Sequence, residues 1–139
     1  LGWYLLLSAA LWSAVKFHFA LCLVPVVSRT LSGLCAVCWR NARGTGLLAS
    51  FTKASHLRHN RVALSLWLLA AGLVLGHLRG WEGVAVLLAA GLTLLYYRRV
   101  SEKEFGGITG DLAGWFVQLC ELTALAAGVI LQKGVGMCI

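Results

Sequence analysis

Charged residues are scarce in this sequence, and acidic residues are the scarcest. Of the 139 residues, 12% are Asp, Glu, Lys or Arg and 60% are hydrophobic, whereas soluble domains contain about 25% charged residues. A soluble domain of this length cannot bury so much apolar surface. The composition therefore argues against a soluble helical protein and predicts a helical protein embedded in a membrane.

The sequence also lacks a nucleic-acid-binding motif and a disulfide framework. Its net charge is +7, but the basic residues cluster between apolar runs, a pattern that membrane topology and anionic lipid headgroups explain. The five cysteines lie mostly inside apolar runs, where cysteine acts as a small hydrophobic residue. Cys35 and Cys38 have no second pair, which argues against a zinc or redox site. We therefore expect membrane lipid, and no nucleic acid, among the partners.

The apolar runs predict an all-α, multi-pass transmembrane bundle that forms a single domain over residues 1–139. The only proline, Pro25, offers a helix start between the first two runs, although these two could also be one long broken helix. Several runs are shorter than the ~20 residues of a comfortable span, which snorkelling and local thinning of the bilayer can accommodate. About five membrane segments are expected, at residues 1–22, 25–39, 62–78, 83–97 and 112–131.

Basic residues gather in two of the breaks between these segments, at residues 40–61 and 98–104. The break at residues 79–83 has only Arg79, opposed by Glu82. By the positive-inside rule, both basic loops should face the cytoplasm and the 79–83 turn should face outward.

The stretch GGITGD, at residues 106–111, places a carboxylate beside a cluster of glycines just before the last apolar segment. Glycines let a backbone approach a ligand closely, and amides at a helix N-terminus favour anions. Asp111 is expected to be either a functional carboxylate or the cap of the last helix, and Thr109 could be the cap instead.

The sequence GGITGDLAGWFVQLCE, at residues 106–121, resembles the C-terminal signature of the cobalamin synthase family, the adenosylcobinamide-GDP ribazoletransferases. Weaker similarity covers most of the chain, including SAVKFHFAL with Lys16 and LVPVVSRTLSG with Arg29. The signature positions that match are Gly106, Gly107, Thr109, Gly110, Asp111, Gly114 and Glu121.

The resemblance implies an enzyme of the bacterial or archaeal cell inner membrane. Such an enzyme joins adenosylcobinamide-GDP to α-ribazole or its 5′-phosphate, releases GMP and uses Mg²⁺. Because phosphoryl transfer needs charge neutralisation and positioning, the expected catalytic residues are Lys16, Arg29 and Asp111. The expected substrate-binding residues are Gly106, Gly107, Thr109, Gly110 and Glu121. Glu121 is alternatively expected to be a buried ion-pair partner of Lys16 or Arg29.

The sequence departs from the family in its acidic residues. The family's D-G-x-x-D type of metal motif is missing, and no two of the five acids have its spacing. The first residue is Leu rather than Met. We therefore expect the Mg²⁺ ligands to lie upstream, and the chain to be the C-terminal portion of a longer enzyme that is inactive alone.

Two alternatives remain. The high glycine and alanine content, which lets helices pack closely, is compatible with a non-enzymatic transporter subunit or scaffold. A lipid-headgroup phosphotransferase is chemically close to the leading hypothesis, but it too needs an acidic metal motif.

Overall fold

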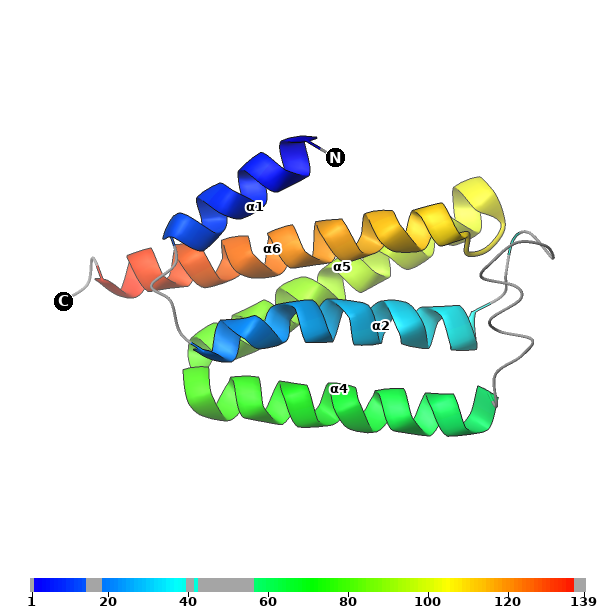
Figure 1. Ribbon diagram of the computed structural model, residues 1–139, viewed down its shortest axis with the longest axis horizontal. Helices are drawn as coiled ribbons and strands as arrows, with labels where there is room; N and C mark the ends of the chain where they lie inside the picture. The colour runs from blue at the N-terminus through cyan, green and yellow to red at the C-terminus, as the bar shows by residue number, and fades with distance from the viewer. Residues whose placement is uncertain (1, 15–18, 40–41, 43–56, 137–139) are drawn as a thin grey trace.

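The structure, a computed structural model, describes residues 2–14, 19–39, 42 and 57–136. Within these ranges the chain is helical, and its helices run back and forth along one long axis (Figure 1). The elements are α1 (Gly2–Ala14), the 3₁₀ helix η1 (Phe19–Leu23), α2 (Val24–Cys38), α4 (Leu57–Arg79), α5 (Trp81–Phe105) and α6 (Gly110–Gly136).

Local sequence explains where two of these helices begin and end. Pro25 lies in the first turn of α2, where its missing N–H removes no hydrogen bond. Gly80 separates α4 from α5 with a φ of 52°, a left-handed value that glycine adopts without steric cost. The expected turn at residues 79–83 is therefore a single glycine, and α5 begins at Trp81.

Four helical stretches are long and apolar enough to cross a membrane: Leu21–Cys38, Arg58–Arg79, Trp81–Phe105 and Gly110–Gly134. The multi-pass helical bundle expected from the sequence is thus confirmed. The first expected segment, at residues 1–22, is not among these four stretches, because α1 has 13 residues and would extend only about 20 Å. The fourth segment is longer than expected, since α5 continues through the basic residues to Phe105.

The outer surface is apolar in the way that a lipid-facing surface must be. On α4, Leu66, Trp67, Leu69 and Leu73 are each more than 60% exposed. A row of such side chains would be a costly patch in water, but it is the expected surface in hydrocarbon. The chain is therefore a membrane protein.

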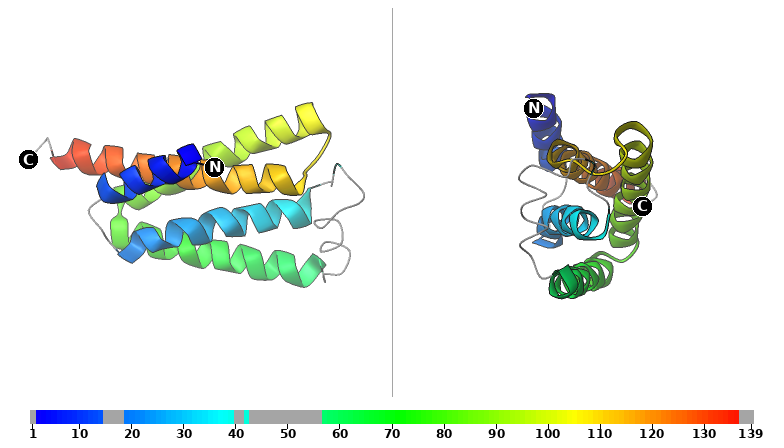
Figure 2. Two further views of the ribbon diagram at one scale, coloured as in Figure 1. Left: turned by 45° about the horizontal axis from the view of Figure 1, so that its top comes forward. Right: turned by 90° about the vertical axis from the view of Figure 1, so that its right-hand side faces the viewer.

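α2 packs against α4, α5 and α6, and α5 packs along α6. Three aromatic rings tie these helices together at one end, because Tyr97 of α5 lies 5.5 Å from Trp39 and 4.6 Å from Phe116 of α6, measured between ring centroids. α1 lies on the outside of the bundle against α6 (Figure 2) and has no fully buried residue.

The first turns of α4, with Arg58 and Arg61, and the last turns of α5, with Arg98, Arg99 and Lys103, lie at the same end of the bundle. The last turns of α2 and α5 meet the first turns of α4 and α6 there, and the α4–α5 turn lies at the opposite end (Figures 1 and 2). This arrangement agrees with the relative placement of the loops that the charge pattern predicts. The stretch at residues 43–56 lies outside the described residues.

Candidate functional site

An ion pair joins α2 to α6 inside the bundle. Arg29 Nη1 lies 2.6 Å from Glu121 Oε1, and the same nitrogen donates a hydrogen bond to the carbonyl of Pro25 at 3.1 Å. Ser28 Oγ donates to Glu121 Oε1 at 3.1 Å, and the Tyr4 hydroxyl donates to Glu121 Oε2 at 2.5 Å. Both oxygens of the Glu121 carboxylate are therefore hydrogen-bonded, and two helices, α1 and α2, contribute the donors.

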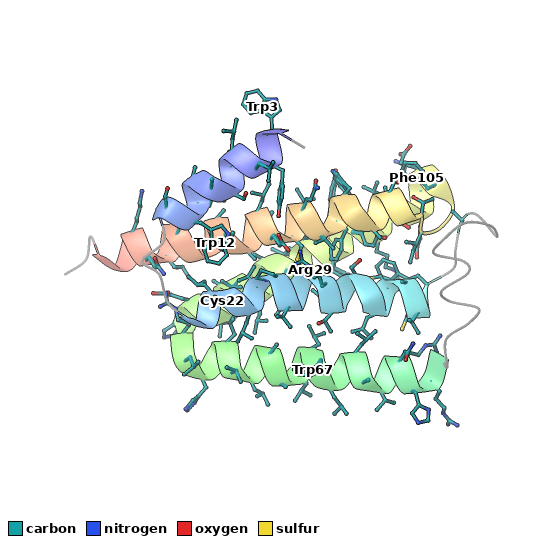
Figure 3. All side chains as sticks on the ribbon, viewed as in Figure 1. Trp3, Trp12, Cys22, Arg29, Trp67 and Phe105 are labelled. Atoms are coloured by element: carbon teal, nitrogen blue, oxygen red, sulfur yellow. The ribbon has the colours of Figure 1, made fainter. Side chains whose placement is uncertain are left out.

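The pair lies at mid-span, where charge is expensive. Arg29 is near the middle of the stretch Leu21–Cys38, and Glu121 is near the middle of Gly110–Gly134. The Glu121 side chain is 11% exposed, but the Arg29 side chain is 64% exposed and emerges between α2 and α6 (Figure 3). A guanidinium at this depth that is open on one side requires water, a ligand or other protein there. The pair therefore marks a candidate binding site.

Backbone groups of the glycine turn between α5 and α6 are hydrogen-bonded within the protein. Gly106 has a φ of 64°, and the amide of Gly107 donates to the carbonyl of Ser101 at 3.0 Å, a Schellman-type helix end. The next residue, Ile108, accepts a hydrogen bond from the amide of Ala42 at 3.0 Å, which ties the turn to the segment after α2. Because the Gly107 amide is already used, the structure does not present it to an anion.

Replacing Gly106 with alanine should cost about 1–2 kcal/mol of stability, because a side chain is strained at this left-handed φ. Gly114→Ala is the control, since a Cβ at Gly114 would meet nothing within 4 Å and its φ is helical. Unfolding in detergent, followed by circular dichroism, measures both. Equal stability of the two variants would contradict the assignment of Gly106 as a conformational glycine.

The start of α6 settles which residue is the cap. The amide of Leu112 donates to Thr109 Oγ1 at 3.3 Å, whereas Asp111 is exposed in the first turn of the helix. Thr109 is therefore the cap, as the sequence allowed, and the alternative that Asp111 is the cap is wrong. Asp111 keeps the favourable position of an anion at a helix N-terminus, and its catalytic role stays a prediction.

Thr109→Ala should therefore destabilise the protein by about 1 kcal/mol, the usual loss when a capping side chain is removed. Asp111→Asn should change stability by about 0.5 kcal/mol or less, because the carboxylate acts only through the exposed helix dipole. The midpoints of denaturant titrations compare the two. A larger loss for Asp111→Asn than for Thr109→Ala would show that Asp111 has a partner beyond the helix terminus.

The structure divides the predicted site residues into two groups. Arg29 and Glu121 lie together at mid-depth, as the alternative role for Glu121 anticipated. Asp111 lies ten residues before Glu121, about 15 Å along the helix, and it is exposed whereas Glu121 is buried. The structure therefore does not bring Asp111 to the mid-depth pair. Lys16 lies outside the described residues, and its role stays a prediction.

Sequence reasoning missed two residues of the mid-depth group, Tyr4 and Ser28. Both are isolated polar side chains in apolar helices, and such residues need a hydrogen-bond partner in hydrocarbon. That requirement was the available signal, but only the fold shows that Glu121 is the partner of both.

The described residues do not form a metal centre by themselves. No three His, Cys, Asp or Glu side chains gather as a metal-binding group in the part of the chain that the structure describes. Cys35 is buried and Cys38 is exposed, and both are free thiols. The described carboxylates thus do not fit a Mg²⁺ site by themselves.

Four membrane-length helices, two of them joined by an ion pair at mid-span, define a multi-pass membrane protein with a charged site between α2 and α6. The sequence matches the model for cobalamin-5-phosphate synthase over residues 1–129, and the chain belongs to this family.

Curated relatives agree with this assignment. The chain is 35% identical over 136 residues to the adenosylcobinamide-GDP ribazoletransferase of Lachnoclostridium phytofermentans, covering 96% of this chain and 52% of the relative. It is 34% identical over 115 residues to the ribazoletransferase of Stutzerimonas stutzeri, covering 83% and 44% of the two chains. The chain thus spans about half the length of these relatives. No solved structure matches it.

Proposed function

We propose that this chain serves the reaction for which its relatives are named, the transfer of ribazole to adenosylcobinamide-GDP. In the form expected from the sequence, α-ribazole or its 5′-phosphate attacks the diphosphate of the donor, and GMP leaves. Beyond family membership, one observation supports the proposal. The guanidinium of Arg29 is paired with Glu121 at mid-depth, yet the Arg29 side chain remains 64% exposed.

Arg29 has the chemistry that a diphosphate requires. A guanidinium binds phosphate oxygens through paired N–H donors and keeps its charge at any physiological pH. Glu121, held by Tyr4 and Ser28, fixes one side of the guanidinium and leaves the other side available. In this proposal Arg29 binds the donor diphosphate and Glu121 positions Arg29.

The glycine turn and Asp111 are proposed to lie where the donor substrate reaches the protein. They lie at the end of the bundle where α5 ends and α4 begins, both with basic residues (Figure 1), and the positive-inside rule supports a cytoplasmic position for that end. A polar donor would reach this face of the bacterial or archaeal inner membrane from the cytoplasm. Mg²⁺ is proposed to assist, with ligands from outside the described residues.

A chimeric enzyme tests the proposed reaction. The region of the Lachnoclostridium phytofermentans relative that this chain matches is replaced by the chain, and membranes are supplied with adenosylcobinamide-GDP and α-ribazole 5′-phosphate. We expect the joined product and GMP by mass spectrometry, and about a 100-fold loss of turnover for Arg29→Leu, since preorganised charge on a reacting group is worth that much. The chain without the rest of the relative should give no product, because it has no acidic metal motif.

Arg61→Leu is the matched control, because Arg61 is an exposed arginine on α4 that donates to the carbonyl of Val37 at 2.9 Å. It should keep turnover within about threefold, as exposed charged groups contribute little. A folded chimera without product would contradict the proposed reaction and favour the non-enzymatic alternative. A chimera equally active with and without Arg29 would remove the role of Arg29 but keep the reaction.

A further inference from the structure

A small cavity opens beside the glycine turn, near the end of α5 where Phe105 lies (Figure 3). Its volume is about 240 Å³, and it is lined by Trp39, Ser101, Glu102, Gly106 and Gly107. Pockets that hold whole drug-sized ligands measure roughly 300–1,000 Å³. This cavity is therefore large enough for one ring system of a ligand but too small for a whole nucleotide.

The cavity contains a polar group that the protein does not satisfy. The Ser101 hydroxyl is fully buried and has no hydrogen-bond partner among the described residues. One helical turn earlier, the hydroxyl of Tyr97 is also fully buried and unpartnered within the same part of the chain. An unsatisfied buried hydroxyl costs about 1–3 kcal/mol, so such a group calls for a missing partner.

The charges around the cavity disfavour an anionic ligand. Glu102 lines the cavity, and its carboxylate accepts a hydrogen bond from Arg98 Nε at 3.1 Å. The Gly107 amide is occupied by the carbonyl of Ser101. A phosphate here would face a carboxylate and would lack that amide donor, whereas a neutral group with N–H donors and nitrogen acceptors matches both Ser101 and Glu102.

The walls favour a flat group. Trp39 contributes an indole, and the guanidinium carbon of Arg98 lies 5.7 Å from the centroid of that ring. Bases stack on both indole and guanidinium planes. Gly106 and Gly107 also line the cavity, and they have no side chains that would hold a flat ring away from the backbone.

We propose that this cavity binds a planar, uncharged nitrogen heterocycle, with Trp39 as the stacking surface and Ser101 as the hydrogen-bonding group. Binding of the ring to the cavity does not depend on the transfer reaction. The identification of the ring as the base of one of the two transfer substrates rests on the proposed function.

The test uses the purified 139-residue chain in lipid nanodiscs and needs no turnover. Benzimidazole, guanine and inorganic phosphate are the probes, and equilibrium dialysis measures their binding. We expect a heterocycle to bind and phosphate not to compete with it. Preference for benzimidazole would assign the cavity to the acceptor base, and preference for guanine would assign it to the donor base.

Trp39→Leu should weaken heterocycle binding about tenfold, the usual effect of removing a stacking surface. Ser101→Ala should weaken it about fivefold through loss of one hydrogen bond. The matched controls are Trp67→Leu and Ser65→Ala on the outer helix α4, where Trp67 is exposed and Ser65 bonds only within its own helix. Neither control should change binding.

Ser101→Ala also separates this inference from a purely structural role. Removing an unsatisfied hydroxyl should make the protein more stable, so a loss of binding together with unchanged or higher stability supports the proposal. Failure of the wild-type chain to bind either heterocycle, or unchanged binding in both cavity variants, would overturn it. Either result leaves the Arg29 experiment in the chimera unaffected, so the two proposals fail separately.

Discussion

Glu121→Leu is expected to lower the free energy of unfolding by about 3 kcal/mol, because it leaves the Arg29 guanidinium without a counter-charge at mid-span, where an uncompensated charge costs about that much. The change leaves Arg29 without its carboxylate at mid-span and takes the acceptor from Tyr4, whereas Ser28 keeps the carbonyl of Pro25 as an acceptor. Denaturation of the chain in detergent, monitored by helical circular dichroism, measures the loss.

The double variant Arg29→Met with Glu121→Leu is the control for this prediction. With both charges gone, no uncompensated ion remains, and apolar replacements of a buried pair are often neutral or stabilising. The double variant should therefore be more stable than Glu121→Leu alone. If both variants lose the same stability, the ion pair seen between α2 and α6 does not explain the effect of Glu121.

Gly83→Val is expected to produce the second large loss, about 3 kcal/mol or more, since overpacking at a helix contact costs about 1–3 kcal/mol and backbone must move as well. A Cβ at Gly83 would lie 2.8 Å from the carbonyl carbon of Leu75 and closer still to its oxygen. The obstacle is backbone of α4, which cannot rotate aside as a side chain can. The start of α5 would have to separate from α4.

Gly91→Ala on the same helix is the matched control. A Cβ at Gly91 would meet nothing within 4 Å, so alanine should raise stability by about 0.5–1 kcal/mol through its higher helix propensity. Detergent unfolding of both variants makes the comparison. Tolerance of valine at Gly83 would contradict the close approach of the two helices.

The helical bundle could be predicted from the sequence because its signal is local. Apolar runs interrupted by basic breaks specify membrane helices, and the helices of residues 57–136 appear where the runs predict them. The helix ends were less predictable. Charged residues ended the predicted fourth segment at residue 97, but α5 continues to Phe105 because an interfacial helix tolerates charge outside the hydrocarbon.

The candidate site was only partly predictable, because its contacts are not local. The isolated charges Arg29 and Glu121 could be recognised, since a charge in hydrocarbon needs a reason. Tyr4 and the unpartnered hydroxyl of Ser101 could not, because their significance depends on which helix faces them. The glycine stretch was given an anion-binding role, but much of it forms a helix end and a cap, which the sequence alone did not distinguish.

The row of rings formed by Trp39, Tyr97 and Phe116 has a mechanical consequence. The three ring side chains, one directly after α2 and one each on α5 and α6, fix the spacing of these helices at one end, whereas α5 begins at the opposite end after a single glycine. The bundle should therefore be stiffer at the Trp39 end than at the Gly80 end. Spin labels on α5 and α6 should report broader distance distributions near Gly80 than near Trp39.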